Sequence, residues 1–167
     1  MSKWINILLD LIKQVQATTA ERDPLAGKTS KRSAPPTQPV ERGVRVEYTP
    51  DMDGDADPGE VVWAWVPYEE DPNRGKDRPV VVIGRATTRS GPRLAGVALT
   101  SKDKGRSDHV AVGTGSWDPK RRDSWAKVDR LLLLDDDDVR REGAVLARNR
   151  FDDVVGNAAK YHDLVRA

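Results

Sequence analysis

Hydrophobic and polar positions along this chain are arranged in short apolar runs, most of which predict strands. The clearest run covers residues 60–66, where Val, Trp and Ala side chains fill both faces of an extended segment. A polar loop is expected at 68–77, and Pro79 then opens a second strand at 80–83, because proline is tolerated at the first position of a strand. Further strands are predicted at 44–48, 94–99, 109–112 and 125–134.

Two stretches repeat apolar residues at helical spacing instead. The first covers residues 3–19 and carries Trp4, Leu8, Leu11, Ile12 and Val15 on one stripe. The second follows the last predicted strand, and its stripe consists of Phe151, Val154, Val155, Ala158, Tyr161 and Val165. Short strands followed by one helix predict a mainly β fold, a small barrel with a C-terminal helix.

The pattern divides the chain into an amphipathic helix at 1–22, a linker at 23–43 and a barrel domain at 44–167. The linker is rich in Pro, Ser, Thr, Lys and Arg and has almost nothing to bury, so it is expected to be disordered or partly polyproline II. The N-terminal helix is too short to span a bilayer. It could pack on its own domain, on a twin subunit, on a partner or on a membrane surface, and a polar face poor in Lys and Arg disfavours the membrane.

Composition limits the possible ligands. The chain has 167 residues, of which 33% are charged and 37% hydrophobic, and its net charge is +1. A polyanion would therefore need a local basic patch. Absence of cysteine excludes disulfides and thiolate metal sites. The acidic segment 51–57 does not match a calcium-binding EF-hand, because Gly54 is fourth and Val62 twelfth in the loop. We therefore expect a solvated turn and no metal site.

Four segments, in order, resemble the MazF/PemK family of bacterial toxins. They are the strand 59–63, the loop and strand 75–83, the strand end Leu99-Thr100-Ser101 and the late strand 124–135. The amphipathic C-terminal segment matches the family's last helix. The resemblance covers roughly residues 58–165, so residues 1–57 fall outside the common toxin pattern. It implies an SH3-like barrel of the MazF/PemK type.

The resemblance also implies an activity. Members of this family are cytoplasmic, homodimeric endoribonucleases of type II toxin–antitoxin systems, and each pairs with a cognate antitoxin protein. They cut single-stranded RNA at specific sequences through attack of the ribose 2′-OH on the adjacent phosphate, without a metal or cofactor. Two alternatives remain open: a barrel that has lost activity and binds RNA or protein, and an interaction module in which the N-terminal helix is the working part.

The resemblance assigns the catalytic residues by position. Arg78 matches the family's catalytic arginine, whose planar fork suits two phosphate oxygens. Thr100 matches the hydroxyl that hydrogen-bonds the scissile phosphate, and Ser101 is a close substitute. Lys127 and Asp129 match a basic and an acidic catalytic position, and on one strand they would share a face. In the alternative without a catalytic role, Arg78 is a surface residue before a strand, Thr100 and Ser101 end a strand, and Lys127 and Asp129 form an exposed ion pair of little energetic value.

RNA binding would fall to residues near these positions. The expected contacts are Lys76, Lys102, Lys104 and Arg106, with Trp117 as the exposed ring on which a base could stack. The acidic residues 69–71 oppose RNA binding, because they lie in the loop that RNA would have to pass. His109 is a candidate general base by its chemistry, although it matches no position of the family pattern, and His162 is expected to be structural.

Overall fold

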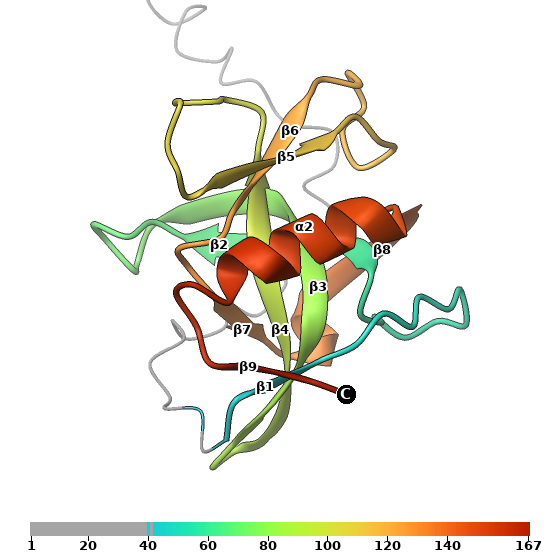
Figure 1. The fold of residues 1–167 in the computed structure, drawn as a ribbon, viewed down its shortest axis with the longest axis vertical. Coiled ribbons are helices and arrows are strands. Elements are labelled where there is room, and N and C mark those ends of the chain that lie inside the picture. The colour runs from blue at the N-terminus through green and yellow to red at the C-terminus, as the bar shows by residue number, and fades with distance from the viewer. Residues whose placement is uncertain (1–39, 41) are drawn as a thin grey trace, which may run out of the picture. The chain divides into compact units, whose positions relative to one another are not determined.

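The computed structural model describes residues 40 and 42–167, and this part of the chain is a curled β-sheet with one α-helix lying across it (Figure 1). The predicted N-terminal helix and nearly all of the linker lie outside the described residues. The strands are β1 (Val44–Val46), β2 (Glu60–Pro67), β3 (Gly75–Thr88), β4 (Gly91–Thr100), β5 (His109–Gly113), β6 (Ser124–Lys127), β7 (Leu132–Leu134), β8 (Val139–Val145) and β9 (Leu164–Arg166). A 3-10 turn, η1 (Asp136–Asp138), precedes β8, and helix α2 (Arg148–Ala158) lies between β8 and β9.

The long hairpin of β3 and β4 is the centre of the sheet. On its outer side β3 pairs first with β2 and then with β1, while β4 pairs with β7 and, at its end, with β6. A bulge between Val82 and Gly84 marks the change of partner. At Gly84 a Cβ atom would collide with the carbonyl oxygen of Arg45, so glycine permits β1 to cross there. The sheet therefore curls into a partly open, SH3-like barrel, which confirms the predicted fold class.

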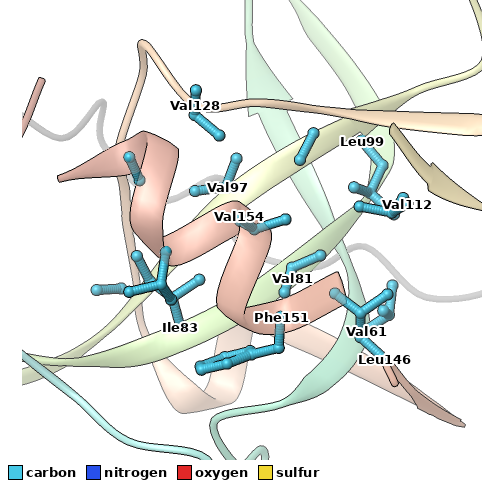
Figure 2. Packing of buried hydrophobic residues seen from close by; sticks show 14 of the residues in the cluster. Val61, Val81, Ile83, Val97, Leu99, Val112, Val128, Leu146, Phe151 and Val154 are labelled. Atoms are coloured by element: carbon cyan, nitrogen blue, oxygen red, sulfur yellow. The ribbon is translucent and has the colours of Figure 1, made fainter. Parts of the chain in front are cut away.

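The unbroken apolar run in β3 is explained by burial on both faces of the sheet. Val81 and Ile83 face the core that α2 covers with Phe151 and Val154 (Figure 2). The alternate residues of the run belong to a second core cluster on the other face. The two faces predicted for β2 are confirmed in the same way, since Val61 lies in the first cluster and its neighbour Val62 in the second.

The predicted strand 125–134 was wrong in one respect, because the structure breaks it into β6 and β7. Val128 and Asp129 form a turn between the two strands. The chain has to bend there, since β6 pairs with the end of β4 at Leu99 and Thr100 while β7 pairs with its middle. The backbone N–H of Val128 donates to the carbonyl oxygen of Asp108, at 2.9 Å, which fixes the turn.

The C-terminal stripe is also shorter than predicted. Helix α2 ends at Ala158, and Val165 lies in β9, where it is 53% exposed. Strand β9 pairs in parallel with β1, so this long-range ladder overrides the local helical spacing. Strand β8 was not predicted at all. At the other end, Val40 of the predicted linker packs, partly buried, against the first core cluster.

Candidate functional site

A groove of about 410 Å³ opens where the ends of β3, β4 and β6 meet the loops that follow β4 and β5. Nine of the ten residues predicted for the site line this groove, and Asp129 is the exception. The nine are Lys76, Arg78, Thr100, Ser101, Lys102, Lys104, Arg106, Trp117 and Lys127. The fold therefore gathers residues that are up to 51 positions apart in the sequence around one concave surface.

Arg78 lies in β3 opposite Ala64 of β2, and it is half-buried. Burial lowers the pKa of Arg78 below its ordinary value, the neighbouring Tyr68 opposes that shift, and a guanidinium remains charged at neutral pH. Within the described residues no hydrogen bond or ion pair engages this guanidinium. A partly desolvated cation with its donors unused is well suited to hold an anion.

Like charges surround Arg78. The pKa of Lys76 lies below its ordinary value because of the positive charge of Arg78 first, then burial, and then the charges of Lys102 and Arg122. Crowded cations repel one another, and a bound polyanion relieves that repulsion. Bulk charge could not reveal this patch, because the chain as a whole is nearly neutral.

Thr100 ends β4 beside this cation cluster. Its Oγ1 accepts a hydrogen bond from the backbone N–H of Lys102, at 3.2 Å, so the hydroxyl proton remains available to donate. Ser101 follows at the first position of the basic loop 101–108 and also lines the groove. The two hydroxyls thus face the same space as the half-buried guanidinium.

Arg106 is held in place by its own loop. Its Nε and Nη2 atoms donate to the two carboxylate oxygens of Asp108, at 2.7 and 2.8 Å. The hydrogen bond from Arg106 holds the pKa of the Asp108 carboxyl well below its usual range. Lys102 and Lys104, in contrast, form no ion pair within the described residues, which leaves both ammonium groups available to phosphates.

The predicted shared strand face of Lys127 and Asp129 was wrong. Lys127 is the last residue of β6 and lines the groove, but Asp129 lies in the turn that follows and does not. The Oδ2 atom of Asp129 lies 4.0 Å from Nη2 of Arg106. Since the strand ends between the two residues, the two-residue period no longer places them on one face.

The acidic loop also reaches the site. Glu69 and Glu70 line a second pocket, of about 270 Å³, which shares Arg78 and Lys127 with the groove. The Nζ atom of Lys127 donates to Glu69 Oε1, at 2.9 Å, and this hydrogen bond lowers the pKa of the Glu69 carboxyl. The ion pair is exposed, so an anionic ligand can compete with Glu69 for Lys127 at little cost.

The exposed stacking ring predicted at Trp117 was wrong. Trp117 is 4% exposed, belongs to the first core cluster and donates its indole N–H to Ser124 Oγ, at 3.2 Å. Its buried side chain forms part of the groove wall. Sequence reasoning missed Asp118 and Arg122, which form an ion pair of 2.7 Å on the same wall. Their spacing of four residues was the available signal.

The two histidines have different surroundings. One ring nitrogen of His162 lies 2.9 Å from the carbonyl oxygen of Val128, in agreement with a structural role. His109 begins β5 and lines the groove. Among residues 40 and 42–167, no group of three or more His, Cys, Asp or Glu side chains is arranged to hold a metal ion. No helix in this range is both long and apolar enough to cross a membrane.

Comparison with known proteins gives one family. The family model for the PemK-like, MazF-like toxin of type II toxin–antitoxin systems matches residues 57–160. Among solved structures, the crystal structure of MazF (Form-I) from Deinococcus radiodurans is similar, with 17% sequence identity and a TM-score of 0.48. That alignment covers 64% of this chain and 94% of the MazF chain. The search of curated proteins gave no match.

Proposed function

Because this chain belongs to the PemK-like, MazF-like toxin family of type II toxin–antitoxin systems, we propose that it is a metal-independent endoribonuclease that cuts single-stranded RNA in the groove around Arg78. The observation that carries the proposal is a half-buried guanidinium with no partner among the described residues, beside the hydroxyl of Thr100. A cognate antitoxin and a homodimeric state are part of the same proposal, by analogy with the family.

The chemistry follows from these groups. The ribose 2′-oxygen attacks the adjacent phosphorus, the bond to the 5′-oxygen breaks, and the products are a 2′,3′-cyclic phosphate and a 5′-OH. The phosphorane formed on the way carries two negative charges. Arg78 donates two N–H groups to its oxygens, and Thr100 donates its hydroxyl proton to a third position on the phosphate. Ser101 is the substitute donor.

The remaining cations bind the RNA on either side of the cut. Lys76, Lys102 and Lys104 hold flanking phosphates, and Lys127 does so once Glu69 releases it. Arg106, braced by Asp108, presents a fixed positive charge at the rim. Asp129 acts from outside the groove, through its contact with Arg106. Single strands fit better than a duplex, because their bases can unstack and turn away from one another to contact the protein.

One observation favours a second candidate. The Glu69–Lys127 pair places a carboxylate at the entrance to the cation cluster. In an inactive barrel that binds protein or RNA, the Glu69–Lys127 ion pair would stay intact. In that case the groove would bind RNA without cutting it.

The test is incubation of the purified protein with a long single-stranded RNA in the presence of EDTA, followed by mapping of the ends. We expect cuts that leave 2′,3′-cyclic phosphate and 5′-OH ends, and at least about a hundredfold slower cutting by Arg78→Ala. Arg150→Ala, an exposed arginine on α2, is the matched control and should cut at the wild-type rate. A strict magnesium requirement, or equal rates for Arg78→Ala and wild type, would contradict the proposal. Binding without cutting would favour the second candidate.

A further inference from the structure

Within the described part of the chain, the buried side-chain nitrogen and oxygen atoms that lack a hydrogen-bond partner belong to only three residues, Trp63, His109 and Asp129. Two of the three line the groove, and the third contacts the groove residue Arg106. Buried polar atoms are nearly always paired in native proteins, because leaving one unpaired costs roughly 1–3 kcal/mol. Within the described residues, these buried side-chain atoms therefore mark unused hydrogen-bonding capacity at the groove.

His109 is the most unusual of the three. Its side chain is 2% exposed, and both of its ring nitrogens are unpaired in the described structure. The ring lies beneath the basic loop 101–108, and its Nδ1 is 3.9 Å from Oδ1 of Asp103, just beyond hydrogen-bond distance. A small approach of Asp103 would place a carboxylate on Nδ1 and leave Nε2 as the free acceptor.

The proposed reaction needs such an acceptor. Arg78, Lys76 and Lys127 are cations and cannot take a proton, and Thr100 is a weak base. Imidazole is the side chain whose ordinary pKa lies closest to neutral pH, and the chain contains two histidines. His162 is bonded to the backbone at Val128 and lies outside the groove lining. The carboxylates that line the groove, Asp77 and Asp118, are each ion-paired with an arginine. His109 is thus the groove residue whose unpaired side chain has the chemistry of a general base.

We infer that His109 is the general base of the cleavage reaction and that Asp103 orients its ring, an inference that rests on the proposed function. Nε2 takes the proton of the 2′-hydroxyl as the 2′-oxygen bonds to phosphorus. The bond from phosphorus to the 5′-oxygen breaks, and the departing oxygen takes a proton from water. The imidazolium then returns its proton to solvent, which restores the enzyme.

The loop 101–108 must shift for this step, because both ring nitrogens are covered in the structure. Residues 102–107 of this loop are exposed, and neither Lys102 nor Lys104 is tied down by an ion pair within the described residues. Phosphates that attract these lysines therefore move the loop, uncover Nε2 and bring Asp103 onto Nδ1. Asp103 is the charged group next to the ring. The charged residues that line the same groove are Lys76, Asp77 and Arg78 on β3, Lys102, Lys104 and Arg106 on the loop, Asp118 and Arg122 after β5, and Lys127 on β6.

The kinetic test compares the full-length variants His109→Gln and His109→Ala with His162→Gln as the matched control. The wild-type rate should fall on the acid side of neutrality, where the base is protonated. His109→Gln should lose at least about a hundredfold in rate and lose that acid limb, whereas His162→Gln should keep both. Added imidazole should restore part of the rate of His109→Ala. A His109→Gln rate equal to wild type, or an unchanged acid limb, would overturn the inference while leaving the proposed function standing.

A second measurement does not require cutting and leaves His109 itself in place. The chain contains two histidines, so the proton NMR spectrum contains one imidazole Cε1–H signal from each, and His162→Gln assigns them. Titration with a 2′-deoxy oligonucleotide, which cannot be cut, should move the His109 signal and shift its pKa, and Asp103→Asn should reduce that shift. If the oligonucleotide binds and the His109 pKa does not move, the inference is overturned. A wild type that binds RNA but cuts none at any pH would instead defeat the proposed function.

Discussion

Glu60 with Arg141 and Lys76 with Arg78 are two pairs of charged residues in the same small barrel, yet their surroundings are opposite. The Glu60 carboxylate is 3% exposed and accepts two hydrogen bonds from Arg141, at 2.8 and 3.1 Å. A backbone N–H and a backbone carbonyl satisfy further atoms of this pair. Lys76 and Arg78 instead repel each other, and neither has an acidic partner within the described residues.

The first pair stabilises the fold, whereas the second pair is arranged to bind an anionic ligand. The hydrogen bonds that Arg141 donates to Glu60 raise the pKa of Arg141, which shows that the folded state favours this charge. Arg78 lowers the pKa of Lys76, which shows that the folded state disfavours that one. Substitutions in the first region should therefore change stability, and substitutions in the second should change RNA binding.

The largest expected effect comes from breaking the satisfied pair. Glu60→Ala leaves the Arg141 guanidinium partly buried without its carboxylate and should lower the free energy of unfolding by about 3–5 kcal/mol. Urea denaturation measures the free energy of unfolding of each variant. Arg150→Ala removes an exposed ion pair with Asp153 and is the control, with an expected loss below about 1 kcal/mol. Equal losses in the two variants would show that the Glu60–Arg141 pair stabilises the fold no more than an exposed ion pair does.

A smaller, pH-dependent effect is expected at Asp108, a satisfied charge beside the groove. Its pKa is lowered in the folded state, so its contribution to stability is present above its ordinary pKa of 3.8 and is lost as the pH falls through the lower folded value. Asp108→Asn should lower the melting temperature at pH 7, and the deficit should shrink as the pH falls below about 3.8. Thermal melts at several pH values test this, and a deficit that stays constant with pH would contradict it.

Lys76→Met should affect binding and spare the fold. Removal of a repelled cation should leave the free energy of unfolding unchanged or slightly raised. The slope of log affinity against log salt for single-stranded RNA should fall by about 0.7, the value for one lost phosphate contact. Arg150→Ala should leave that slope as it is. A clear loss of stability in Lys76→Met would show that the cation cluster also supports the barrel.

The smallest overall effect, on stability and binding together, is expected at Glu69. Its ion pair with Lys127 is exposed, so Glu69→Gln should change the free energy of unfolding by less than about 1 kcal/mol. The same substitution frees Lys127 and should raise the affinity for RNA at low salt. Fluorescence anisotropy with a labelled RNA measures it. Weaker RNA binding by the variant would mean that Glu69 itself contacts the ligand.

Local pattern was enough for the parts of the fold whose burial follows the chain. The apolar runs at 80–83 and 60–66 locate β3 and β2, because residues buried on both faces of a strand must all be apolar. The predicted bounds of β3 were wrong, since the strand begins at Gly75, inside the predicted loop 68–77, and extends to Thr88 through its pairing with β2 and β4. Strand β8 gave no such signal. It contains Arg140, Arg141 and Glu142, and it is a strand because β2 offers it a hydrogen-bonding edge. Val165 fitted a helical period by coincidence, and its pairing with β1 depends on residues about 120 positions away.

The same distinction between local sequence pattern and tertiary structure applies to the site. The sequence by itself determined that Arg78 lies just before a buried apolar run, that Thr100 ends another strand and that a loop of three basic residues follows, since these are local features of strands and turns. Only the tertiary structure decided that Trp117 is buried, that Asp129 leaves the groove and that His109 lies unpaired beneath the loop. Hydrogen bonding, desolvation and Coulomb energy depend on distances of a few ångströms between residues far apart in the chain, and the fold alone sets those distances.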